Sequence, residues 1–352
     1  MNILGLSSEF ELGDALKTIV QSLQLTTLLP TILLVASIVL LFYPSLDELD
    51  ITAIGLLIFA AVSISFLFHT LNMPLIRLWE GYIWNDAWLM QQLRISQLKL
   101  FDEMKGTIRL CKDREGEIDE ILDDLALGAS RYEEDERILE GWKRGWRDHR
   151  RQLFERLEER FPPSRRQVLP TSLGNAIAAF EWYPFERYRM DTIQLWTRFV
   201  PVLAAKKYAV YVQNEKAILD FLINMLSGSV VVFLASLVKF GISGNWIALV
   251  IAGGLIGIGY VLFKAAVVAA ANWGGTVKAA FDLYRHDLRH LLCLHLPKSS
   301  LEGEREMWQG VSDFLAFNNV ESFQGFEYDL VPSGQQEKQK ETRSILLPGG
   351  GS

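Results

Sequence analysis

The residues most able to bind a metal ion stand close together near position 290, at His286, His290, Cys293 and His295. His286 and His290 are four residues apart and would share one face of a helix, and imidazole and thiolate groups both bind zinc. Cys293 and His295 cannot lie on one helical face, and Asp287 is the one acidic residue nearby that could support a ligand. We therefore expect structural or surface roles for these histidines and predict no metal site.

Aromatic and cationic residues alternate in the segment WKRGWRDHRR, from Trp142 to Arg151. Aromatic rings interleaved with cations can bind single-stranded nucleic acid or anionic lipid headgroups. However, acidic residues stand on both sides of this segment, at 133–136 and at Glu155, Glu158 and Glu159. This pattern favours a solvated helix of mixed charge whose two tryptophans are buried in a domain, so we expect no nucleic acid partner.

Polar residues gather in and after the sequence LPTSLGN, at Asn175, Glu181, Glu186, Arg187 and Asp191. They could form a buried polar network, although acids and bases at junctions of loops and helices more often cap helices or pair. The chain has no G-x-x-x-x-G-K-[ST], G-x-S-x-G or H-E-x-x-H motif. The sequence therefore predicts no catalytic residue and no cofactor, and it favours a protein that is not an enzyme.

The composition separates into apolar runs and charged segments. Half of the 352 residues are apolar and 22% are charged, with a net charge of −7 that gives no general attraction to nucleic acid. Four apolar runs are long enough to cross a bilayer: Leu25–Tyr43, Ile51–Leu71, Leu219–Phe240 and Trp246–Trp273. We therefore predict an all-α integral membrane protein with four transmembrane helices in two hairpins.

A helical cytosolic domain is expected between the second and third spans. Within it, Gly116 is expected to separate two helices and Pro201 to follow the end of another, and the second span is expected to continue as a long helix. The predicted divisions are an amphipathic N-terminal helix (1–24), hairpin 1 (25–71), the cytosolic domain (72–216), hairpin 2 (217–272), C-terminal cytosolic helices (273–331) and a disordered tail (332–352).

The distribution of basic residues predicts the orientation. The short connectors at 44–50 and 241–245 contain no Lys or Arg, whereas basic residues are frequent beyond Leu71. Cytoplasmic loops collect Lys and Arg, so we expect a bacterial inner-membrane protein with both termini in the cytoplasm. Cys111 and Cys293 then lie in the cytosol and should stay reduced.

Two features inside the spans suggest helix contacts. Gly253 and Gly257 are four residues apart, a spacing that lets helix backbones approach closely, either within one bundle or between subunits or around a pore. Lys264 falls on the face of Gly257, at the estimated depth of Asp220 at the cytosolic end of the third span. Lys264 could therefore extend to the headgroups or form an interfacial charge pair with Asp220.

The segments PLIRLWEGY (74–82) and LPTSLGNAIAAFEWYPFERYRMDTIQLW (169–196) resemble a group of uncharacterised bacterial multi-pass membrane proteins. Those proteins carry P-L-x-R-x-x-E-G-Y after the second span and a later L-P-T-x-L-G-N…E…Y-P…R-Y-G-x-D…W segment. The matching residues here are Arg77, Glu80, Asn175, Glu181, Arg187 and Asp191, with Arg189 in the place of the glycine. The resemblance implies the same architecture and no particular activity.

Three functions remain open. The first is an oligomeric inner-membrane protein whose cytosolic domain senses or docks a partner and acts on the spans, which could form a channel or pore. Its partners would be the lipid bilayer, further copies of the chain, and a cytosolic protein or small molecule. The second is a membrane-anchored scaffold without transport activity. The third is a membrane-bound enzyme that uses the region between Asn175 and Asp191.

Overall fold

The protein is helical throughout the parts that the structure describes. The structure is a computed structural model that describes residues 26–43, 50–83, 87–127, 133–294 and 300–319. These residues form α-helices and a short 3-10 helix, η2 (Arg165–Gln167), without a β-strand among them, which confirms the predicted all-α class. The chain divides into two compact units: unit 1 is Met1–Phe180 with Val210–Val277, and unit 2 is Glu181–Ala209 with Lys278–Ser352. Each unit is therefore built from two separate stretches of the chain.

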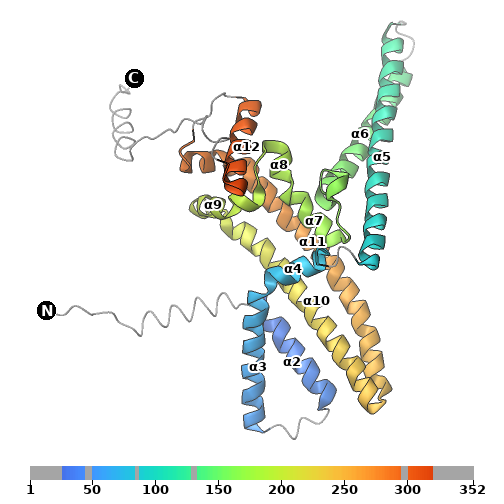
Figure 1. Ribbon diagram of the computed structural model, residues 1–352. Coiled ribbons are helices and arrows are strands. Elements are labelled where there is room, and N and C mark those ends of the chain that lie inside the picture. Colours follow the sequence, from blue (N-terminus) through green and yellow to red (C-terminus); the bar gives the residue numbers. More distant parts are fainter. Residues whose placement is uncertain (1–25, 44–49, 84–86, 128–132, 295–299, 320–352) are drawn as a thin grey trace, which may run out of the picture. The chain divides into compact units, whose positions relative to one another are not determined.

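Three helices of the described residues are long and apolar enough to cross a membrane (Figure 1). They are α3 (Ile51–Thr70), α10 (Ala209–Ser243) and α11 (Trp246–Leu291). Helix α2 (Leu28–Phe42) is also apolar, but its 15 residues make it shorter than the others. At the usual helical rise its length is about 22 Å, compared with a hydrocarbon core of about 30 Å.

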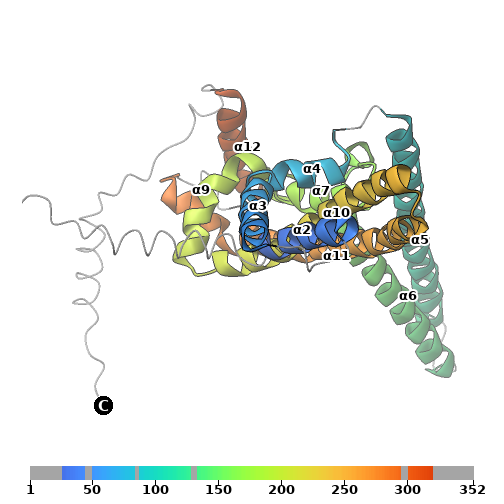
Figure 2. The same cartoon turned by 90° about the horizontal axis from the view of Figure 1, so that it is seen from below.

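Helices α2 and α3 form a hairpin and lie side by side in both views (Figures 1 and 2). The Ser65 hydroxyl of α3 donates to the Thr27 hydroxyl before α2 over 3.2 Å, and both side chains are buried. Helix α3 ends at Thr70, and α4 (Asn72–Glu80) is a separate short helix that ends at Gly81 in a left-handed conformation. The predicted continuation of the second span as one long helix is therefore wrong.

Helices α5 (Trp88–Leu127) and α6 (Glu133–Arg160) form a second, mostly polar hairpin. At its base a small core contains Phe101, Leu157, Phe161 and Val168. Farther along, the guanidinium group of Arg150 donates to both carboxylate oxygens of Glu115, over 2.7 and 2.9 Å. Gly116 lies inside α5, so the prediction that it separates two helices is wrong.

Unit 2 contains α8 (Tyr183–Tyr188), α9 (Thr192–Ala205), the end of α11 and α12 (Leu301–Phe317). Its core joins α9 to α11, where the rings of Phe199 and Phe281 lie 4.8 Å apart and both side chains are fully buried. Pro201 stands inside α9, which continues to Ala205, so the expected helix end before Pro201 is also wrong.

Helix α8 ends at Arg189, whose φ of 63° lies in the left-handed region. The amides of Arg189 and Met190 donate to the carbonyls of Phe185 and Pro184, which closes the helix end. Glycine adopts this conformation readily because it has no Cβ atom, whereas other residues do so at a cost. Arg189 therefore holds a backbone conformation that glycine would adopt without this cost.

Replacing Arg189 by glycine should therefore stabilise the protein by about 1 kcal/mol, because the left-handed conformation no longer opposes a Cβ atom. Arg189→Ala is the matched control, since it keeps the strained φ and removes the guanidinium group that lies 5.3 Å from the centre of the Phe185 ring. Thermal melting of the two variants in detergent measures the difference. A glycine variant no more stable than the alanine variant would contradict this explanation.

Candidate functional site

Two tyrosine hydroxyls converge on one carboxylate in unit 2. Tyr183 donates to Asp282 Oδ2 over 2.8 Å, and Tyr188 donates to Asp282 Oδ1 over 2.6 Å. The tyrosines stand at the two ends of α8, and Asp282 lies on α11. One side chain of α11 therefore holds both ends of this short helix. We call Tyr183, Tyr188 and Asp282 the tyrosine–aspartate cluster.

Cations surround the tyrosine–aspartate cluster. Arg187 contacts the Tyr183 hydroxyl, and its guanidinium nitrogen lies 3.9 Å from Asp282. Lys278 lies 5.4 Å from the centre of the Tyr183 ring, and Arg285 lies 4.3 Å from the centre of the Tyr188 ring. The Asp282 carboxylate thus accepts a hydrogen bond from each phenol within a group of nearby cations.

Arg285 extends the cluster to α12. Its Nε donates to Glu304 over 2.9 Å, and the Glu304 side chain is almost completely buried. His286 Nδ1 lies 3.8 Å from the same carboxylate oxygen. A buried carboxylate without a cation would be costly, so this pairing fixes α12 against α11.

The phenols of the cluster have raised pKa values. Burial, followed by the hydrogen bond to Asp282, raises the pKa of both Tyr183 and Tyr188 above its usual range. A general acid or base works best with a pKa near the working pH. Both phenols instead remain protonated donors, which suits a structural connection between α8 and α11.

Tyr183→Phe should lower the free energy of unfolding at neutral pH by about 1 kcal/mol, since one hydrogen bond to Asp282 is lost. A phenol whose pKa is raised on folding stabilises the protein below about pH 10, its value when unfolded. That contribution decreases as the pH rises above about 10 toward the folded pKa. The difference between wild type and variant should therefore shrink at alkaline pH.

Unfolding measured between neutral pH and pH about 11 checks this pattern. Tyr211→Phe removes the hydroxyl of an exposed tyrosine and serves as the control. It should keep the alkaline loss of stability that wild type shows. A Tyr183→Phe variant that loses stability with pH as steeply as wild type would exclude the role of the phenol.

In unit 1, the end of α4 meets the start of α7 (Ser172–Glu181). The Thr171 hydroxyl donates to the carbonyl of Glu80 over 2.9 Å and accepts from the amide of Gly174 over 2.9 Å. A Cβ atom at Gly174 would lie 2.5 Å from the Glu80 carbonyl oxygen. The segments PLIRLWEGY and LPTSLGN, far apart in the chain, therefore contact each other through backbone atoms.

Gly174→Ala should destabilise the protein by roughly 1–3 kcal/mol, because the added methyl group would overlap the Glu80 carbonyl. Gly116→Ala is the control, since a Cβ atom at Gly116 meets open space inside helix α5. It should stabilise α5 by about 0.5–1 kcal/mol through higher helix propensity. The melting temperatures of both variants report the effect. Equal shifts would show that α4 and α7 do not approach this closely.

Asn175 organises the loop before α7. It is fully buried, and its side chain accepts from the Leu169 amide over 2.6 Å and donates to the Leu169 carbonyl over 3.0 Å. It also donates to Gln97 of α5 over 3.2 Å. Of the two other predicted residues on α4, Glu80 is buried and Arg77 is exposed.

The remaining members of the predicted network lie in unit 2. The Glu181 carbonyl accepts from the Thr192 hydroxyl over 2.6 Å, and the Asp191 carboxylate caps α9 by accepting from the Gln194 amide over 3.0 Å. Arg187 joins the tyrosine–aspartate cluster. These residues therefore do not form one network; they cap helices and pair separately, which is the alternative that the sequence favoured.

The predicted charge pair between Asp220 and Lys264 does not form. Asp220 pairs with Lys216, four residues earlier on α10, over 2.6 Å. Lys264 instead lies over the ring of Tyr260, with Nζ 5.5 Å from the ring centre. A lysine one turn away on the same helical face is a nearer partner than one on another helix, which is why the prediction failed.

Gly253 and Gly257 face open space. A Cβ atom at either position would have no neighbour within 4 Å in the described part of the chain. Gly259 instead faces α10. A Cβ atom added at Gly259 would lie 3.7 Å from the Ser229 hydroxyl oxygen and 3.8 Å from a methyl carbon of Leu226. The described chain therefore does not use Gly253 and Gly257 for packing within its own bundle.

Polar side chains that the sequence analysis missed hold α10 to neighbouring segments of unit 1. Trp79 of α4 donates to the Ser227 hydroxyl over 3.0 Å, and Asn224 donates to the carbonyl of Thr26 over 2.9 Å. Asn224 and Ser227 are three residues apart on one buried face of α10. That spacing in an apolar helix was the available signal, because buried polar groups in spans bond across helices.

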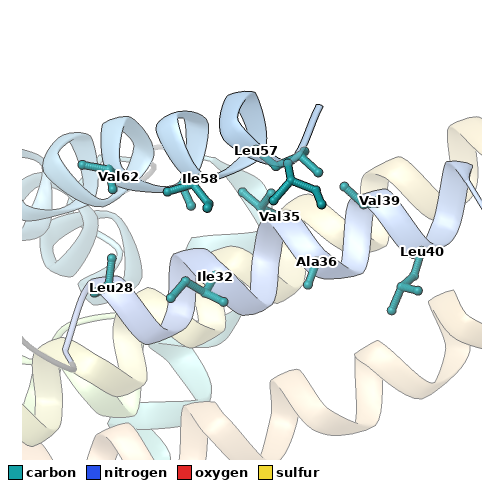
Figure 3. Close-up of a pocket in the computed structure, with 11 residues that line it drawn as sticks. Leu28, Ile32, Val35, Ala36, Val39, Leu40, Leu57, Ile58 and Val62 are labelled. Atoms are coloured by element: carbon teal, nitrogen blue, oxygen red, sulfur yellow. The ribbon is translucent and has the colours of Figure 1, made fainter. Parts of the chain in front are cut away.

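The two tryptophans of α6 differ from expectation. Trp142 and Trp146 of α6 are 62% and 39% exposed, so the predicted burial of both tryptophans is wrong. An apolar groove of about 570 Å³ lies between α2 and α3. It is lined by residues such as Ile32, Val35 and Ile58 (Figure 3). The groove has no polar group to orient a small ligand, so it suits acyl chains or apolar side chains.

No three His, Cys, Asp or Glu side chains are grouped to hold a metal ion in the described parts of the chain. His286 lies near Glu304, while His290 Nε2 lies 3.1 Å from a nitrogen of Arg289. His295 falls outside the described residues.

No protein-family model, curated protein or solved structure matches this chain.

Proposed function

We propose that the chain is a multi-pass inner-membrane protein with four spans in two hairpins and both termini in the cytoplasm. The observation that carries this proposal is apolar helix surface that the described residues leave uncovered. Only 17% of the most apolar window of α3 and 11% of that of α11 is buried. Exposed apolar helices of this length are stable where lipid or other apolar helices cover them.

The length of α11 supports a connection between membrane and cytosolic parts. Its 46 residues extend over about 69 Å, and a bilayer core takes up only about 30 Å of that length. The apolar part after Trp246 would lie in the membrane, while the polar part carries Asp282 and Arg285. A partner that binds near the tyrosine–aspartate cluster would thus act on the helix that forms the fourth span.

The glycine face of α11 supports assembly into an oligomer. Gly253 and Gly257 leave a strip without side chains on an exposed helix surface. Small residues let helices of neighbouring subunits approach closely in lipid, where van der Waals packing drives association. In the proposed protein, copies associate through this face, and their cytosolic helices dock a protein or a small molecule. Such a ring of copies could enclose a channel.

Gly257→Leu should break up this oligomer, because the added side chain separates the backbones at a cost of roughly 1–3 kcal/mol per contact. Leu255→Ile, which keeps the side-chain volume two residues away, should leave the assembly intact. Mass measurement of the purified protein in nanodiscs, together with conductance in planar bilayers, tests the proposal. A monomeric wild-type protein would overturn the oligomer, and an oligomer without conductance would favour a membrane-anchored scaffold.

A further inference from the structure

Helix α4 begins directly at the end of a proposed span. Helix α3 ends at Thr70, and Leu71 alone separates it from α4, which starts at Asn72. The Leu71 amide donates to the carbonyl of Leu67, and the Leu71 carbonyl accepts from the amide of Leu75, both over 2.8 Å. This hydrogen-bonded connection leaves no free length of chain between the two helices. Helix α4 therefore starts at the depth in the membrane where α3 ends.

The length of α3 places that depth at the cytosolic headgroups. At the other end of α3, the Asp50 carboxylate caps the helix by accepting from the Ile51 amide over 2.7 Å. A carboxylate is costly inside hydrocarbon, so this end belongs in the opposite headgroup layer. The 20 residues of α3 extend over about 30 Å, which equals the thickness of the hydrocarbon core. Thr70 therefore reaches the cytosolic headgroups, where α4 starts.

A contact with α10 gives the same depth independently. Trp79 of α4 donates to the Ser227 hydroxyl of α10 over 3.0 Å. The pair of Lys216 and Asp220 holds the last charges before the apolar part of α10, and Ser227 comes seven residues after Asp220. That distance is about 10 Å along the helix. The indole of Trp79 thus reaches the boundary between headgroups and hydrocarbon, where tryptophan is enriched in membrane proteins.

Helix α4 runs across the axis of α3. Figure 2 looks nearly along α3 and shows α4 extending sideways from it, and Figure 1 shows the same turn from the side. Both helices belong to unit 1. A helix that turns away from the span axis at the depth of the headgroups lies along the membrane surface.

The two sides of α4 differ as an interfacial helix requires. The buried side carries Asn72, Ile76 and Glu80 at steps of four residues. Met73 and Arg77 follow the same step on the neighbouring side and are exposed, Met73 by 49%. A methionine side chain is apolar and adaptable, and a guanidinium group binds phosphate oxygens through two parallel hydrogen bonds. Acyl carbons and phosphate groups are what a phospholipid leaflet offers at this depth.

We propose that α4 lies in the headgroup layer of the cytosolic leaflet, where Met73 contacts the first acyl carbons and Arg77 binds phospholipid phosphate. Lipid is the occupant because Leu71 fixes α4 to the end of a span. The proposal rests on the span proposed above for α3 and adds a lipid-binding surface to it. Arg77 is then the lipid-binding residue of the segment PLIRLWEGY, whose Glu80 contacts α7 through its carbonyl.

Quenching of a fluorescent label by nitroxide lipids measures the depth of α4. The full-length protein carries Cys111→Ala and Cys293→Ser, and it is labelled at a single introduced cysteine and placed in nanodiscs. A nitroxide on the lipid headgroup should quench most of the fluorescence of labelled Met73→Cys. It should quench little of the fluorescence of labelled Ile121→Cys, which is the control because Ile121 is exposed near the far end of the polar helix α5.

Labelled Phe59→Cys separates this proposal from the proposed function, because Phe59 is exposed near the middle of α3. A nitroxide in the middle of the acyl chain should quench its fluorescence. Absence of this quenching would overturn the span and the lipid-binding surface together. Quenching at Phe59→Cys, with Met73→Cys quenched no more than Ile121→Cys, would overturn the position of α4 and leave the proposed function standing.

Arg77→Gln tests the binding of phosphate. Wild type should melt at a higher temperature in nanodiscs of phosphatidylglycerol than in nanodiscs of phosphatidylcholine, whose headgroup carries a cation beside the phosphate. Arg77→Gln should lose part of this difference. Arg109→Gln removes an exposed arginine of α5 and should keep the whole difference. A wild type without lipid dependence, or an Arg77→Gln variant that keeps the whole difference, would overturn the binding of phosphate by Arg77.

Discussion

Apolar helix surface that the described residues do not cover is the constraint on which the rest of this structure depends. Helices α3 and α11 expose most of their apolar residues, and a backbone inside lipid must satisfy its hydrogen bonds within each helix. Long uninterrupted helices can place apolar side chains against lipid and satisfy their backbone hydrogen bonds internally. The same continuity extends α11 beyond the apolar part as far as Leu291. A single element can therefore serve as a span and as the base of a folded polar unit.

Specific polar contacts decide how these helices pack, because apolar side chains alone give lipid-facing helices little preference for one partner. In unit 1, the bond from Trp79 to Ser227 fixes α4 on α10. The close approach of Gly174 to Glu80 fixes α7 on α4. In unit 2, Asp282 fixes α8 on α11 by accepting hydrogen bonds from the phenols of Tyr183 and Tyr188. Each contact joins residues that are distant in the chain, and each depends on a small or buried side chain at one position.

The helical class and the three helices long and apolar enough to cross a membrane were predictable from the sequence, because hydrophobicity and length determine whether a helix can cross a bilayer. Local signals were less reliable. Gly116 lies inside α5 and Pro201 inside α9, since tertiary packing outweighs the propensity of one residue. Asp282 was missed because its tyrosine partners stand more than 90 residues away, and no spacing rule connects them. The proposed pair of Asp220 and Lys264 failed for the opposite reason, since a local partner on the same helix was overlooked.

The expected burial of Trp142 and Trp146 assumed that a charged helix with large aromatic residues packs inside a domain. A hairpin of two helices has one internal face, and on α6 Leu157 lies in the core at that face. Trp142 lies elsewhere on α6 and is exposed, in a helix where most residues are charged. A single exposed tryptophan on a helix surface is normal and does not by itself indicate a partner. The aromatic residues of α6 therefore did not predict burial, because burial depends on how many elements surround a helix and the spacing of its residues does not give that number.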